Sequence, residues 1–142
     1  MSMKTTTNGL EDFKINVKIK LSSLWAAVMS CYIYGDYFEL YVPKKLAGFI
    51  SGETMLDSPV KLFGASVLLA IPACMIFLSI ILKPKVNRVL NIIFGMFFTA
   101  IMALIAVTSI TPWYTFYVFL AITESVITSL IVWYAVKWPK AS

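Results

Sequence analysis

Four long apolar stretches alternate with short polar segments along this chain of 142 residues. A helix that crosses a bilayer needs about 20 predominantly apolar residues, because each residue advances the helix by about 1.5 Å. The pattern therefore predicts an all-α fold, a bundle of four transmembrane helices that follows a polar segment over residues 1–20 and precedes a short end over residues 139–142. The predicted transmembrane helices cover residues 21–42, 60–82, 86–108 and 113–138.

Prolines mark the limits of these stretches. Proline is tolerated in the first turn of a helix and just past its end, and it is costly in the interior. Pro59 and Pro112 open the second and fourth predicted helices, while Pro43 and Pro139 follow the first and the fourth. Only Pro72 lies in the middle of a predicted helix. We expect it to kink that helix, either as a packing feature or as a hinge.

Basic residues gather on one side of the predicted membrane. Nine of the twelve lysines and arginines lie in residues 1–20, in the turn between the second and third helices, or at the C-terminal end. Cytoplasmic loops carry an excess of lysine and arginine, so we expect both termini in the cytoplasm. The outer loop contains KKLAGFISG, which favours a short interfacial helix with Leu46, Phe49 and Ile50 facing lipid. The segment FKINVKIK before the first helix is interpreted as a strand-like lead-in or as a segment bound to anionic headgroups.

Composition excludes an ordinary soluble domain. Hydrophobic residues make up 60% of the chain and charged residues only 13%, against about 25% charged residues in soluble proteins. The net charge of +5 is explained by membrane orientation, so no nucleic-acid partner is expected. The chain has no histidine, which removes the commonest metal ligand and general base. We therefore predict no cofactor, no metal, no catalytic residue and no enzymatic activity. Cys31 and Cys74 are interpreted as packing residues.

The acidic residues inside the predicted helices carry most of the functional information. Asp36 lies about one turn outward from the middle of the first helix, and Glu39 lies one turn further. Tyr32 shares their face of the helix, because the spacings of four and three residues match the helical period. Glu124 lies near the centre of the fourth helix.

Further polar residues accompany these acids. Tyr117 and Thr128 share the face of Glu124, and Asn91 lies near the cytoplasmic end of the third helix. An ionised carboxylate in the middle of a bilayer costs roughly 2.5–3.5 kcal/mol, and no lysine or arginine lies in the interior of a predicted span; those within the spans lie near their ends. Each acid must then be protonated and hydrogen-bonded, face water, or bind a mobile cation.

Three interpretations follow. In the first, the polar residues are structural and link helices through hydrogen bonds. In the second, they form a proton- or cation-linked site for a small apolar solute, as in a transporter subunit or homo-oligomer similar to small multidrug transporters. In the third, which is the least favoured, the protein is an enzyme acting on a lipid or a quinone.

Three sequence stretches carry a resemblance to a known family. LSSLWAAVMSCYIYGDYFEL, IPACMIFLSIILKPKVNRVLNIIFG and ESVITSLIVWYAVKWPK resemble small uncharacterised bacterial membrane proteins with four helices, grouped as a domain of unknown function. The resemblance implies a multi-pass protein of the bacterial inner membrane and supplies no activity or ligand. The positions that carry it are Trp25, Tyr32, Asp36, Pro72, Asn87, Asn91 and Glu124.

Overall fold

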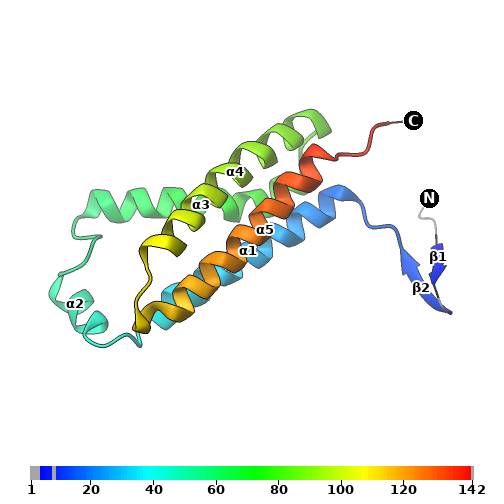
Figure 1. Cartoon of the computed structure of the whole chain (residues 1–142). Helices are drawn as coiled ribbons and strands as arrows, with labels where there is room; N and C mark the ends of the chain where they lie inside the picture. Colours follow the sequence, from blue (N-terminus) through cyan, green and yellow to red (C-terminus); the bar gives the residue numbers. More distant parts are fainter. Residues whose placement is uncertain (1–3, 8, 142) are drawn as a thin grey trace.

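The computed structural model describes residues 4–7 and 9–141. This part of the chain is dominated by helices, as Figure 1 shows. The long helices are α1 (Val17–Glu39), α3 (Pro59–Ile81), α4 (Pro84–Thr108) and α5 (Thr115–Val136). The short elements are the strands β1 (Lys4–Thr7) and β2 (Leu10–Phe13), the helix α2 (Lys45–Ser51) and the 3-10 turn η1 (Pro112–Tyr114).

The N-terminal hairpin is a departure from the all-α prediction. Strands β1 and β2 pair antiparallel, with Thr7 opposite Leu10, and Gly9 between them has a φ of +79°, which glycine adopts without steric cost. The segment FKINVKIK is divided, because Phe13 ends β2 and Val17 already begins α1. The strand-like interpretation therefore holds only for its first residue, and its contact with headgroups stays a prediction.

Helix α1 begins and ends earlier than the predicted span over residues 21–42. The side chain of Asn16 accepts a hydrogen bond from the backbone N–H of Lys18 at 2.8 Å, so it caps the helix start. At the other end, Leu40 follows the helix in a turn. The helix α2 occupies the place where a short interfacial helix was predicted, and its side chains Leu46 and Ile50 are exposed; its position at the interface stays a prediction.

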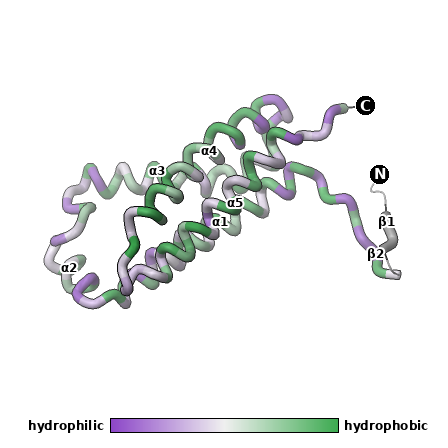
Figure 2. Tube along the Cα trace, in the orientation of Figure 1, coloured by the Kyte–Doolittle hydropathy of each residue, from purple (hydrophilic) through white to green (hydrophobic). Residues whose placement is uncertain are grey.

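Three helical segments are long and apolar enough to cross a membrane: Pro59–Ile81, Pro84–Thr108 and Pro112–Val136. Helix α1 matches them in length with 23 residues but is not one of the three, because it carries two lysines near its start and two acids near its end. Figure 2 shows the apolar residues along the long helices and the polar ones in the connections. The sequence and structure together are those expected of a membrane protein.

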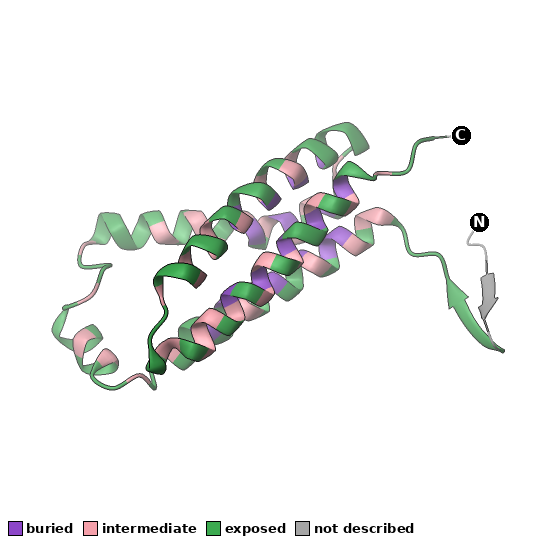
Figure 3. Ribbon diagram, viewed as in Figure 1, coloured by how far each residue is buried: buried purple, intermediate pink, exposed green. Residues whose placement is uncertain are grey.

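The helices are arranged so that α1 packs against both α3 and α5, and α4 packs against α5. Helices α3 and α4 contact each other little. They meet near the turn that joins them and then separate (Figure 1). Buried positions form stripes that face the inside of the bundle, while the outer faces are exposed and largely apolar (Figures 2 and 3). A contiguous apolar surface of this kind is typical of contact with a membrane.

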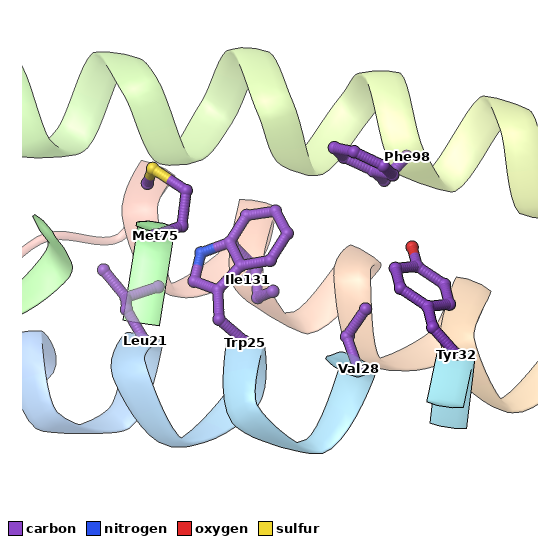
Figure 4. Packing of buried hydrophobic residues seen from close by; sticks show 7 residues of the cluster. All are labelled: Leu21, Trp25, Val28, Tyr32, Met75, Phe98 and Ile131. Atoms are coloured by element: carbon purple, nitrogen blue, oxygen red, sulfur yellow. The ribbon is translucent and has the colours of Figure 1, made fainter. Parts of the chain in front are cut away.

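The hydrophobic core lies between α1 and its neighbours and is drawn in Figure 4. Helix α1 supplies most of it, since spacings of three and four residues place one face of the helix inside. The rings of Trp25 and Phe98 meet edge to face, with centroids 6.1 Å apart. The core residues are Leu21, Trp25, Val28, Tyr32, Met75, Phe98 and Ile131.

Pro72 lies inside α3, which is continuous from Pro59 to Ile81. Its side chain is buried. Because proline has no backbone N–H, the carbonyl of Leu68 lacks the partner that an α-helix normally provides. Both interpretations of Pro72, as a packing kink and as a hinge, stay predictions.

Candidate functional site: a cavity between four helices

A cavity of about 250 Å³ lies between α1, α3, α4 and α5. It lies in the part of the bundle where α3 and α4 have separated, because its walls include Ala65 near the start of α3 and Ile105 near the end of α4. The loop after α2 contributes Leu56. The other apolar lining residues include Leu68, Leu69, Ile101, Met102, Leu120 and Ala121.

Polar side chains enter the cavity from two helices only. Helix α1 contributes Tyr32 and Asp36, which are four residues apart and therefore share a face. Helix α5 contributes Tyr117 and Glu124, which are seven residues apart and share a face for the same reason. The lining residues of α3 and α4 are all apolar. The cavity is thus an apolar pocket in which two carboxyl groups and two phenol groups converge.

Glu124 is the most deeply placed acid, with an exposed fraction of 4%. Among the described residues, its carboxyl group has no hydrogen-bond or ion-pair partner; only its backbone carbonyl accepts a bond, from the hydroxyl of Thr128 at 3.0 Å. Asp36 is exposed. Its carboxyl group also has no hydrogen-bond or ion-pair partner among the described residues. No lysine or arginine belongs to the cavity wall, so neither carboxylate is neutralised by a fixed cation.

Tyr32 adds a second buried polar group without a partner. Its exposed fraction is 8%, and its hydroxyl is the one fully buried side-chain nitrogen or oxygen of the described residues that makes no hydrogen bond. Figure 4 shows the side chain extending from α1 toward Phe98, with ring centroids 6.2 Å apart. Buried tyrosine hydroxyls usually find a partner, and leaving one unpaired costs about 1–3 kcal/mol. The hydroxyl is therefore a hydrogen-bonding group without a partner among the described residues, and it belongs to a residue that lines the cavity.

Asn91 lies outside this cavity, in a hydrogen-bonded network near the α3–α4 turn. Its side-chain oxygen accepts a bond from Trp25 Nε1 at 2.8 Å, and its amide donates to Asn87 Oδ1 at 2.7 Å. Asn87 in turn donates to the backbone carbonyl of Ser79 at 2.6 Å. The structure therefore does not bring Asn91 together with the acids of the cavity; its amide takes part in hydrogen bonds that join α1, α3 and α4.

Thr128 and Glu39 also lie apart from the cavity. The hydroxyl of Thr128 is 2.6 Å from that of Thr99, and this contact joins α5 to α4. Glu39 forms an ion pair with Lys45 Nζ at 2.9 Å and accepts a bond from the Tyr114 hydroxyl at 3.3 Å. This hydrogen-bonded carboxylate raises the pKa of Lys45. Of the predicted site residues, the structure thus brings Tyr32, Asp36, Tyr117 and Glu124 together, and places the others in contacts between helices.

The fold and the cavity define a class of protein: a helical bundle with membrane-capable helices around an apolar cavity that contains unpaired acids. Residues 10–142 match a family described as a family of unknown function, DUF6326, and the chain belongs to this family. The resemblance that the sequence carries to an uncharacterised family is thereby confirmed. No curated protein and no solved structure matches the chain.

Proposed function

We propose that this protein is an integral membrane protein with four transmembrane helices whose cavity binds a small, mostly apolar solute. One observation supports the proposal most strongly. The cavity is lined by Tyr32, Asp36, Tyr117 and Glu124 among mostly apolar residues, and the described residues provide no hydrogen-bond partner for the Tyr32 hydroxyl or for the two carboxyl groups. Binding pockets for small molecules typically combine apolar walls with a few converging polar groups.

The fourth transmembrane helix in this proposal is α1. It contacts α3 and α5, both of which are long and apolar enough to cross a membrane. Its 23 residues give a length of about 35 Å at 1.5 Å per residue, which exceeds the roughly 30 Å of a hydrocarbon core. One of its two acids, Asp36, is exposed and lies at the cavity wall. A helix packed along two spanning helices lies in the same membrane layer.

The proposed orientation has both termini in the cytoplasm, with the protein in the bacterial inner membrane. The distribution of lysine and arginine supports it. Reporter fusions after Lys140 and next to Lys83 should be active on the cytoplasmic side, and a fusion near Gly52 should be active on the outer side. The opposite result at these positions would reverse the orientation. A tag at the N-terminus that is found on the outer side, with these three signals unchanged, would remove α1 from the set of spanning helices.

The distribution of hydrogen bonds between polar side chains favours solute binding over a purely structural role. Residues that link helices should bond one another, as Trp25 and Asn91 do at 2.8 Å. The hydroxyl of Tyr32 makes no such bond, and no bond joins Asp36 to Glu124. Keeping unpaired polar groups in this cavity lowers the stability of the protein, and a bound solute compensates for that cost.

A transporter subunit is the second candidate function. Its supporting observation is that Pro72 lies one turn beyond Leu68 and Leu69, which line the cavity. A proline at that position lets the part of α3 that forms the cavity wall move relative to the rest of the helix. Transport would require such a movement, whereas binding alone would not.

The native cysteines provide a direct test of solute binding. Cys31 lines the cavity, Cys74 does not, and both are half-buried. We expect a small maleimide to react with Cys31 in nanodiscs, and we expect saturating tert-butylbenzene to slow that reaction. The rate at Cys74 should be unchanged. The rate at Cys31 is measured in the Cys74→Ser protein, and the rate at Cys74 is measured in the Cys31→Ser protein. An unreactive Cys31, or equal protection of both thiols, would contradict the proposed cavity function.

A further inference from the structure

We infer that the solute is a monovalent organic cation and that its positive charge sits against Glu124. This inference rests on the proposed function and specifies the chemical class of its ligand. It begins from two polar groups on buried residues that have no hydrogen-bond partner in the described part of the protein, the Tyr32 hydroxyl and the Glu124 carboxyl group. Both belong to residues that are more than nine-tenths buried, and both residues line the same cavity.

The charge of the cavity wall favours a positive ligand. The wall contains Asp36 and Glu124 and no lysine or arginine, so any fixed charge in it is negative. An anionic solute would find no positive partner in this wall, and a neutral one would supply no counter-charge for an ionised carboxylate.

The remaining wall favours an organic cation over a metal ion. Hard metal ions require several oxygen ligands, whereas most residues of this wall are apolar. The described residues contain no group of three or more histidine, cysteine or acidic residues that could hold a metal ion. The rings of Tyr32 and Tyr117 line the cavity, and aromatic rings attract quaternary ammonium groups. The volume of about 250 Å³ is below the roughly 300–1,000 Å³ of pockets for drug-sized ligands, so the cation is small.

Binding of the cation is coupled to a proton. Without the cation, the uncompensated Glu124 carboxyl group retains its proton; when the cation binds, the O–H bond breaks, the proton leaves to bulk water and the carboxylate faces the positive charge. Charge is conserved, because one positive charge enters as one leaves. The other titratable groups that face the cavity are Cys31, Tyr32 and Asp36 on α1 and Tyr117 on α5, and α3 and α4 contribute none. The affinity for the cation should therefore rise with pH.

A matched pair of ligands tests the inference. Phenyltrimethylammonium and tert-butylbenzene have the same shape and differ in charge. In nanodiscs of phosphatidylglycerol, with Cys31 labelling as the measurement, we expect the cation to protect at a concentration at least ten times lower than its neutral counterpart. In Glu124→Gln, this preference should fall to about one, while protection by tert-butylbenzene stays unchanged. The partitioning of tert-butylbenzene into lipid is the same for both proteins. Its effect is therefore removed when wild type and Glu124→Gln are compared with the same ligand.

The control variant is Glu39→Gln, which makes the same change on a carboxylate that is paired with Lys45 outside the cavity. It should keep the wild-type preference. A pH series on the unmodified protein gives a second measurement that requires no variant: protection by the cation should increase with pH, and protection by tert-butylbenzene should not.

The outcomes separate this inference from the proposed function. Equal protection by both ligands in the wild type would overturn the cation assignment and leave solute binding intact, whereas absence of protection by either would overturn both. A preference that survives in Glu124→Gln would remove Glu124 from the site. Displacement of the cation by sodium ions at constant ionic strength would overturn the organic class. Slower labelling in phosphatidylcholine nanodiscs without added ligand would identify a lipid choline headgroup as the source of the cation.

Discussion

The two ends of the bundle differ in whether their polar side chains form hydrogen bonds with one another. Near the α3–α4 turn, which we call the closed end, Trp25 and Asn91 form a continuous network of hydrogen bonds with Asn87 and Ser79. At the cavity, which we call the open end, the carboxyl groups and the Tyr32 hydroxyl have no partners among the described residues. Trp25 and Tyr32 are only two turns apart on the same face of α1, so a single helix serves both ends.

The difference arises from the distance between α3 and α4. At the closed end these helices are joined by a short turn, so that Asn87 on α4 reaches the backbone of Ser79 on α3 at 2.6 Å. At the open end they have separated, and the residues that they present are apolar. Polar residues therefore form hydrogen bonds between helices at one end and line a mostly apolar cavity at the other. Predictions about variants follow from this contrast.

The largest effect is expected for Asn91→Leu at the closed end. The change leaves Trp25 Nε1 and Asn87 Oδ1 buried without their partner. Each such group costs about 1–3 kcal/mol, so the free energy of unfolding should fall by roughly 2 kcal/mol or more. At the open end, Glu124→Gln should change it by less than about 0.5 kcal/mol, because no bond of the carboxyl group is lost. Unfolding by SDS in mixed micelles, followed by circular dichroism, measures both; equal losses would abolish the contrast.

A smaller effect is expected at the glycines of the cavity-forming helices. A Cβ atom on Gly95 would lie 2.7 Å from Val132 Cγ2 and 3.4 Å from the backbone oxygen of Thr128, because α4 and α5 pack closely there. Gly95→Ala should lower the free energy of unfolding by about 1–3 kcal/mol. The control Gly64→Ala on α3 has no neighbour within 4 Å and should be neutral or stabilising by up to about 1 kcal/mol. A stabilising Gly95→Ala would show that the α4–α5 contact adjusts freely.

The smallest effect is expected for Lys45→Gln, which breaks the ion pair with Glu39. Partly exposed ion pairs contribute about 0.2–1 kcal/mol and are screened by salt. Since the pKa of Lys45 is raised in the folded protein, its contribution is complete below the unfolded pKa of about 10.4 and is lost as the pH rises through the higher folded value. The stability difference between wild type and variant should thus be constant from pH 6 to 9, and should shrink at high salt. A difference that changes within that pH range would point to another titrating group.

The three most apolar helices could be predicted closely from the sequence, because long apolar runs bounded by Pro59, Pro84 and Pro112 leave few alternatives. The start of α1 was harder to predict, since its cap, Asn16, lies in a polar segment. The N-terminal hairpin was missed although the sequence contains an Asn8–Gly9 dipeptide, which is a strong hairpin signal, after three β-branched threonines. Attention to turn residues would have found it.

The site could be predicted only in part. Helical periodicity places Tyr32 and Asp36 on one face and Tyr117 and Glu124 on another, and the energetic cost of exposing acids to lipid directs both faces inward. Periodicity does not indicate which helices diverge, so it cannot distinguish Asn91, which forms hydrogen bonds with other side chains, from Glu124, whose carboxyl group forms none with the described residues. The apolar wall residues, such as Leu56 and Met102, carry no chemical signal at all.

The composition of α1 has a consequence for the way the protein is made. In the proposed topology α1 is synthesised before α3 and α5, yet it is not among the three segments that are apolar enough by themselves to cross a membrane, and Asp36 and Glu39 near its end add to the cost of insertion. The helices that compensate for this cost, α3 and α5, leave the ribosome later, and α5 leaves last. Stable insertion of the first helix therefore awaits the completion of the last, and a chain interrupted before Thr115 exposes α1 to degradation.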